Sequence, residues 1–277
     1  NGSSTTEDVD TTLKYHYGVR GKSIEVDMST SHTETVDVPS FWTKGLVRNV
    51  DTDTDYYKIQ HAIDNASAGD TLNVWAWTYY ENNVTLHGEG LTVMGNGTTN
   101  TTINGTWQDS NIVRIVEGYD ITLKNLKLVS GSNSSSYPLI HVYMDDVTLD
   151  GLEVHGGYTG IKIVNGDDIT IKNTKVIDTL NRAIWVSVNT INFNLHNSIL
   201  SNGGGSGIYV DWGSLNVNIH NNSIHNNSGS GIIFHSYGST IRDNIVVDNE
   251  DWGIQLNGRW SDDIDNILLS SGSYPCF

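Results

Sequence analysis

The sequence predicts an all-β fold in which short strands wind into a parallel solenoid. Short segments that alternate apolar and polar residues begin at Ile140, Ile161, Ile184, Ile208, Ile232 and Ile254, so they recur after 21, 23, 24, 24 and 22 residues. Gly, Asn and Ser separate them. Period-2 alternation between such residues is typical of strands joined by turns. A unit this short cannot bury its own apolar row, but stacked units bury a continuous one, so we expect each repeat to be one coil.

Each coil continues with a second alternating segment, namely ITLKNLKL, VTLDGLEV, ITIKNTKV, FNLHNSIL, VNIHNNSI and STIRDNIV. Where this segment turns, Asn125, Asn173, Asn197 and Asn221 recur, and Gly151 takes the place in one coil. We expect these asparagines to point inward and to hydrogen-bond one another and the turn backbone. The alternative is an ordinary solvated turn.

A helical pattern precedes the repeats. Ile59, Ala62, Ile63 and Ala66 fall on one face of a helix predicted at about residues 55–66. Such a helix can cover the open edge of the first coil, and Thr54 or Asp55 is its expected N-cap.

The same region, residues 56–97, resembles the opening of right-handed parallel β-helix proteins of the pectate-lyase-like superfamily. It is most similar to NosD-like and carbohydrate-binding repeats of archaeal and bacterial surface proteins. The similar motifs are the helix Ile59–Ala66, Gly69-Asp70-Thr71, and Tyr79-Tyr80-Glu81-Asn82.

The resemblance covers about residues 54–267, and it implies a right-handed parallel β-helix of about seven to eight coils. We therefore assign residues 54–277 to the β-helix and residues 1–53 to a strand-rich N-terminal extension. Within that extension, KSIEVDM (22–28) and ETVDVPSFW (34–42) alternate like edge strands.

Composition restricts the partners of the chain. Its 15 Lys and Arg residues against 32 Asp and Glu residues give a net charge of −17, which disfavours binding to nucleic acid or to anionic membranes. Apolar runs stay below the roughly 18 residues that would cross a bilayer, so we expect no membrane insertion.

The start at Asn1 and the many Asn-X-Ser/Thr sequences favour a secreted, glycosylated protein whose signal peptide has been removed. We expect an extracellular or cell-surface location. The candidate glycosylation sites are Asn1, Asn65, Asn83, Asn96, Asn100, Asn104, Asn133, Asn221 and Asn226.

Two other sequence features give weaker indications of partners or ligands. Cys276 is the only cysteine, so a disulfide would have to join two chains. Asp51, Asp53 and Asp55 alternate as in calcium loops, but Ala62 stands where an EF-hand has Glu. We expect no cofactor, with calcium as a minor candidate here and at the pairs Asp145-Asp146 and Asp167-Asp168.

Two outward-facing ladders are predicted beside the first strand of each coil, with rungs about 4.8 Å apart. The first consists of Arg114, His141, Lys162, Trp185, Tyr209, Ile233 and Gln255, and the second of Tyr143, Val164, Ser187, Asp211, His235 and Asn257. The family resemblance implies that polysaccharide lyases and epimerases of this fold hold their sites on such ladders.

β-Elimination of a uronate needs a cation at the sugar carboxylate and a base for the adjacent proton. Arg114, His141 and Lys162 could supply both, with Tyr143 as the acid. Asp211 beside His235 is a second acid/base candidate, about four coils from His141. The alternative is that a solvated face simply collects polar residues.

Aromatic residues gather toward the C-terminal half, where they could stack on sugar rings or anchor a protein interface. They are Trp185, Tyr209, Trp212, Trp252 and Trp260.

Three functions fit these patterns. The favoured hypothesis is a structural protein of a surface layer, sheath or filament, whose partner is itself, assembling through the extension, the last coil or the aromatic face. The alternative is a polysaccharide lyase or another carbohydrate-active enzyme. A non-catalytic glycan-binding module is the third.

Overall fold

The computed structural model describes residues 13–16, 23–26, 47–105, 110–130, 137–257, 261–264 and 267–269. The chain divides into two compact units, residues 1–43 and 44–277. In the first unit, β1 (Leu13–His16) and β2 (Ser23–Val26) form an antiparallel pair in which Leu13 lies opposite Val26. Part of the predicted strand 22–28 is therefore paired within its own unit. The segment 34–42 lies outside the described residues.

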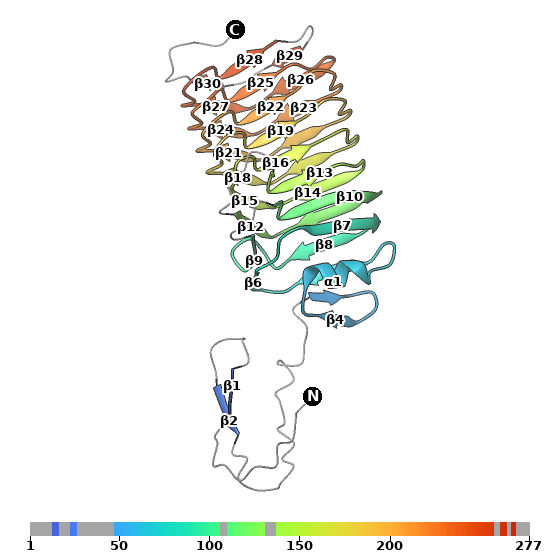
Figure 1. Cartoon of the computed structure of the whole chain (residues 1–277). Helices are drawn as coiled ribbons and strands as arrows, with labels where there is room; N and C mark the ends of the chain where they lie inside the picture. Colours follow the sequence, from blue (N-terminus) through green and yellow to red (C-terminus); the bar gives the residue numbers. More distant parts are fainter. Residues whose placement is uncertain are drawn as a thin grey trace. The chain divides into compact units, whose positions relative to one another are not determined.

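The second unit is a right-handed parallel β-helix, as predicted (Figure 1). Its strands stack coil upon coil in three sheets. The first sheet contains β7 (Val84–Glu89), β10 (Val113–Tyr119), β13 (Ile140–Val142), β16 (Ile161–Ile163), β19 (Ile184–Val186), β22 (Ile208–Val210), β25 (Ile232–Phe234) and β28 (Ile254–Leu256).

The other two sheets complete each coil. The second sheet contains β5 (Thr71–Val74), β8 (Thr92–Gly95), β11 (Ile121–Lys124), β14 (Val147–Asp150), β17 (Thr170–Lys172), β20 (Asn194–His196), β23 (Asn218–His220), β26 (Ser239–Arg242) and β29 (Ser261–Ile264). The third contains β6 (Trp77–Tyr79), β9 (Thr101–Asn104), β12 (Lys127–Ser130), β15 (Glu153–Gly156), β18 (Lys175–Ile177), β21 (Ile199–Ser201), β24 (Ser223–His225), β27 (Ile245–Val247) and β30 (Ile267–Leu269).

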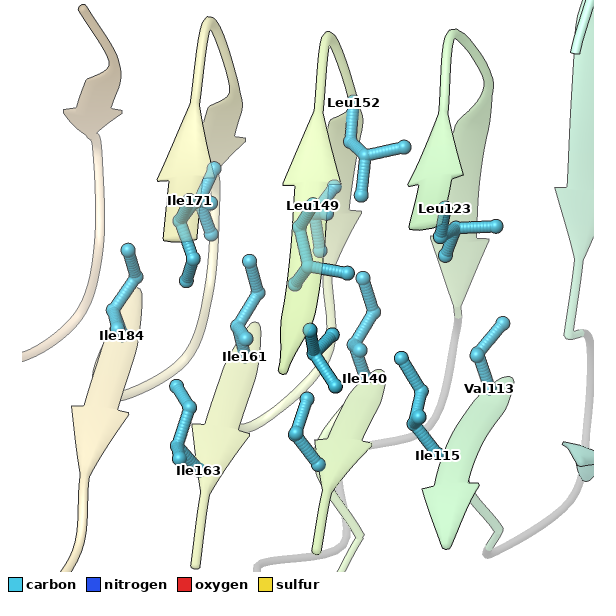
Figure 2. Packing of buried hydrophobic residues seen from close by; sticks show 14 of the residues in the cluster. Val113, Ile115, Leu123, Ile140, Leu149, Leu152, Ile161, Ile163, Ile171 and Ile184 are labelled. Atoms are coloured by element: carbon cyan, nitrogen blue, oxygen red, sulfur yellow. The ribbon is translucent and has the colours of Figure 1, made fainter. Parts of the chain in front are cut away.

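The predicted repeat sets the register of the core. Ile140 pairs with Ile161, Ile161 with Ile184, and the same position continues through Ile208 and Ile232 in successive coils. All five side chains are fully buried. Figure 2 shows how isoleucines of the first sheet and leucines of the second point into the shared interior. Each such burial contributes roughly 1.5–3 kcal/mol, so the alternating pattern is what closes the coils.

The N-terminal end of the helix is covered by three elements. β3 (Val47–Asn49) pairs antiparallel with β5 and with β4 (Thr54–Tyr56). Helix α1 (Ile59–Asp64) contacts β7 and β3, and its residues Ile59, Ala62 and Ile63 are buried as predicted. An unpaired strand edge would template strand addition, and these elements occupy that edge.

The predicted helix start is wrong. Thr54 and Asp55 belong to β4, and the N-cap is Lys58, which makes no side-chain cap bond. Instead, the carboxylate of Glu81 accepts hydrogen bonds from the amides of Ile59 at 3.0 Å and Gln60 at 3.3 Å. The cap comes from the next coil because residues 54–56 are needed as a strand.

The predicted inward asparagine row is displaced by one residue. Asn125, Asn173, Asn197 and Asn221 are exposed and have left-handed backbone angles, with φ between 51° and 57°. A residue in that conformation makes the turn, and the residue after it points inward. The inward row is Leu126, Leu152, Thr174, Ser198, Asn222 and Asn244. No helix of the described chain is long and apolar enough to cross a membrane.

Candidate functional site

The outward-facing residues of the first sheet pair from coil to coil in the predicted order. Arg114 pairs with His141, His141 with Lys162, Lys162 with Trp185, and Trp185 with Tyr209. Ile233 and Gln255 continue the row. Because strands of adjacent coils lie about 4.8 Å apart, these side chains form a continuous line along the solenoid.

A cavity of about 340 Å³ lies at the N-terminal part of this row, and Arg114, His141 and Tyr143 are among the residues that line it. Asn111 also lines it. The buried Asn111 side chain donates a hydrogen bond of 2.6 Å to the carbonyl of Pro138, which connects the two chain segments that enter β10 and β13. Three of the four residues predicted for β-elimination therefore share one cavity.

His141 is buried, with 7% of its surface exposed. Burial and then the charges of Lys162 and Arg114 lower the pKa of His141 to about 4, so the imidazole is neutral at pH 7. Its Nε2 atom has no hydrogen-bond partner in the described part of the chain. The Tyr143 ring packs on the imidazole with 3.9 Å between ring centroids. The imidazole can accept a proton at Nε2, but this atom is buried, so a ligand reaches it only after neighbouring side chains move.

Lys162, the fourth predicted residue, belongs to a neighbouring group of side chains. Its Nζ atom lies 3.9 Å from the centroid of the Trp185 ring. The guanidinium carbon of Arg182 lies 4.7 Å from the Trp185 ring centroid and 4.4 Å from that of Tyr209. We call Lys162, Arg182, Trp185 and Tyr209 the Arg182 cluster. Two cations thus lie on the Trp185 ring, which takes up ring surface that a sugar would need for stacking.

Burial and the charge of Arg182 lower the pKa of Lys162, while the charge of Asp211 opposes this shift. The indole Nε1 of Trp185 is buried and has no hydrogen-bond partner among the described residues. Sequence reasoning missed Arg182 because it precedes β19 and stands outside the alternating pattern.

In the second predicted acid/base pair, Asp211 and His235 each contact other groups. The Asp211 carboxylate accepts a 2.9 Å hydrogen bond from the backbone amide of Trp212. His235 contacts the rings of Tyr209 and Trp212, at 5.4 Å and 4.6 Å between centroids. Burial lowers the pKa of His235, although the charge of Asp211 acts in the opposite direction. This arrangement is an aromatic cluster more than a proton-transfer pair.

Of the other two predicted aromatic residues, only Trp252 is among the described residues. The Trp252 carbonyl accepts a hydrogen bond from the amide of Gly231. In successive coils the carbonyls of Arg182, Ser206, Ser230 and Trp252 accept the equivalent bond, so Trp252 lies three coils beyond Arg182. Trp260 lies outside the described residues.

Three cations of this face lack a carboxylate partner. Within residues 47–105, 110–130 and 137–257, Arg114, Lys162 and Arg182 form no ion pair. Lys58, Lys124 and Lys175 likewise form no ion pair within these residues, whereas Arg48, Lys127, Lys172 and Arg242 each lie within 4.0 Å of an acidic side chain. In a chain with a net charge of −17, these three side chains are local positive charges on an acidic protein.

The calcium candidates are engaged with the protein itself. Asp53 and Asp55 pair with Arg48, and the Asp51 carboxylate accepts a 2.7 Å bond from the Thr71 amide. Asp145 accepts a 2.8 Å bond from the Asp167 amide in the next coil. Over the described residues, no group of three or more His, Cys, Asp or Glu side chains is placed to hold a metal ion.

The candidate glycosylation sites lie mainly on the surface. Asn104 is half-buried, and the other candidate sites in the described chain are exposed, namely Asn65, Asn83, Asn96, Asn100, Asn221 and Asn226. Asn1, Asn133 and the Cys276 thiol lie outside the described residues.

The sequence from residue 89 to residue 249 matches the family model of the right handed beta helix region. The chain belongs to this family. Comparison with curated proteins finds no match. Among solved structures, the chain resembles the Agl-KA catalytic domain with a TM-score of 0.59 and 18% identity, over 77% of this chain and 44% of that one. It therefore spans less than half the length of that relative.

A second similar structure is a pectin methylesterase mutant in complex with a hexasaccharide, with a TM-score of 0.53, 12% identity, and 76% and 78% of the two chains covered. A periplasmic alginate epimerase is similar at a TM-score of 0.49 and 15% identity, over 76% of this chain and 68% of that one. At these identities the likeness to the Agl-KA domain and to the pectin methylesterase shows the β-helix fold.

Proposed function

We propose that this β-helix is a carbohydrate-active protein that holds an acidic polysaccharide along the outer face of its first sheet and cleaves it by β-elimination. The observation that carries the proposal is the line of unpaired cations, Arg114, Lys162 and Arg182, beside the neutral and unpartnered His141.

The charge of this face selects the ligand. A carboxylate placed against Arg114 gains charge-assisted hydrogen bonds, and the guanidinium has no competing carboxylate in the described residues. The same carboxylate offsets the two positive charges that help to lower the pKa of His141. Binding of an acidic sugar therefore makes His141 a stronger base at the moment when a base is needed.

The chemistry follows from the cavity residues. Arg114 neutralises the uronate carboxylate, which stabilises negative charge on the carbon next to it. His141 Nε2 takes the proton from that carbon, the bond to the glycosidic oxygen breaks, and the Tyr143 hydroxyl donates a proton to the departing oxygen. The products are an unsaturated sugar end and a new hydroxyl end.

One of the similar structures supports a carbohydrate ligand, because the pectin methylesterase was solved with a hexasaccharide. It shares the fold only, so the choice of substrate rests on the residues of this chain.

The test is the absorbance of unsaturated uronate when the protein is incubated with a panel of acidic polysaccharides. We expect product with the unmodified chain, and a loss of at least about 100-fold in His141→Gln, which is the usual contribution of a positioned acid or base. Lys175→Gln, which removes an exposed cation of the third sheet, is the matched control and should keep full activity. Binding without product on every polysaccharide would contradict the elimination step and leave a glycan-binding module.

The structural role favoured by the sequence stays a prediction. The segment 34–42 and Cys276, through which that role could work, lie outside the described residues. The other candidate segment, 22–28, contains β2, which is already paired with β1.

A further inference from the structure

The Arg182 cluster is separate from the cavity around His141. Arg114 and Trp185 lie in the same row three coils apart, with His141 and Lys162 between them. At about 4.8 Å per coil, the two positions are about 14 Å apart along the solenoid. A group that touches Arg114 cannot also touch Arg182 unless it belongs to a larger molecule.

The cluster positions its donors for an anion. The guanidinium carbon of Arg182 lies 4.7 Å and 4.4 Å from the centroids of two aromatic rings, which hold the group in place without using a carboxylate. Its side chain makes neither an ion pair nor a hydrogen bond within the described residues. A guanidinium fixed in this way is suited to bind a planar carboxylate through two parallel hydrogen bonds.

Two further features point to a bound anion. Lys162 and Arg182 lie on the same ring and repel each other, which is one cause of the lowered pKa of Lys162. The buried Trp185 Nε1 has a proton to donate and has no acceptor in the described chain. An anion bound beside the two cations relieves the repulsion, and it reaches the buried Nε1 only if the covering side chains move. Asp211 is the acidic residue whose charge reaches Lys162, but the two form no ion pair.

We propose that Arg182, Lys162 and Trp185 form a second anion subsite, which binds another carboxylate of the same acidic polysaccharide. This inference rests on the proposed function. It makes the protein selective for length and charge spacing, because a ligand needs two carboxylates far enough apart to reach side chains from coils about 14 Å apart along the solenoid. A monomeric uronate fills one subsite at a time, whereas a long enough oligomer bridges the two and gains affinity through linkage.

The experiment is a calorimetric titration of the whole chain with uronate oligomers of increasing length. The unmodified protein should show a stepwise rise in affinity at the length that first spans both subsites. Arg182→Gln should abolish the step, lowering affinity for long oligomers about tenfold or more, while short oligomers bind as before at the Arg114 subsite. Lys175→Gln should keep the step.

Three outcomes separate the two proposals. A step that is lost in Arg182→Gln supports the second subsite. A step that survives in Arg182→Gln while Arg114→Gln loses binding overturns the second subsite and leaves the proposed function standing. Absence of binding to acidic oligomers of any length, by a chain whose circular dichroism shows folded β-structure, overturns both. Circular dichroism of each variant guards against loss of fold.

Discussion

The buried side chain of Asn222 donates a hydrogen bond of 3.0 Å to the side-chain oxygen of Asn244 in the next coil. Asn222 also donates to the Leu195 carbonyl and accepts from the Ser198 amide. The Asn244 side chain reaches the Ile219 carbonyl in the same way. This ladder satisfies backbone groups at a bend that water cannot reach.

Asn222→Ala should therefore destabilise the chain by about 2 kcal/mol or more, since the Ser198 amide and the Leu195 carbonyl each lose the hydrogen bond to the buried Asn222 side chain. The matched control is Asn221→Gly. Asn221 is exposed with φ of 55°, a backbone angle that glycine adopts freely, so its change should cost only a few tenths of a kcal/mol. Chemical denaturation measures both. Equal stability of the two variants would contradict the ladder.

Glu81 should stabilise the capping helix from outside it. Glu81→Gln weakens the bonds to the Ile59 and Gln60 amides, and we expect a loss of about 1 kcal/mol together with faster amide exchange in α1. Glu117→Gln, an exposed change on β10, serves as the control. Unchanged exchange in Glu81→Gln would show that packing alone holds the helix.

His141 should make the fold sensitive to acid. Its folded pKa of about 4 lies below the ordinary value of 6.5, so protonation favours the unfolded chain, and the contribution is complete above pH 6.5 and lost as the pH falls toward 4. The difference between these two pKa values corresponds to at most about 3 kcal/mol of unfolding free energy. His141→Gln should lose less unfolding free energy between pH 7 and pH 4.5 than the unmodified chain. Parallel pH profiles would rule out a neutral, buried His141.

Tyr143 should control access to His141. Tyr143→Ala removes the ring that packs on the imidazole, so water reaches Nε2 and the pKa of His141 rises toward 6.5. An NMR titration of the imidazole measures this shift. Leu180→Ala, an exposed change elsewhere on the solenoid, is the control. A pKa that stays at about 4 in Tyr143→Ala would show that the Tyr143 ring does not shield the imidazole from water.

The self-assembly hypothesis has its own measurement. If residues 1–53 donate a strand to a neighbouring molecule, the full chain should form large species in light scattering at high concentration, and removal of residues 1–43 should abolish them. A strictly monomeric full chain would contradict this role.

The repeat and the alternation that include Ile140, Ile161 and Ile184 were enough to predict the fold and the order of the outward row. Side chains of a strand point alternately to its two faces, so only one register of neighbouring coils buries all the apolar side chains. The asparagine row was misplaced by one residue, since the sequence does not show which turn residue adopts the left-handed conformation. Arg182 was missed for a related reason. Its contacts with Trp185 and Tyr209 depend on a loop path that periodicity does not describe.

The most direct test of the central claim compares acidic with neutral polysaccharides in a calorimetric titration of the unmodified chain and of the double variant Arg114→Gln, Arg182→Gln. The account predicts that the unmodified chain binds the acidic polysaccharide and not a neutral one of equal length, and that the double variant loses this binding at least about 100-fold. Equal binding of the neutral polysaccharide, or undiminished binding of the acidic one by the double variant, would contradict it.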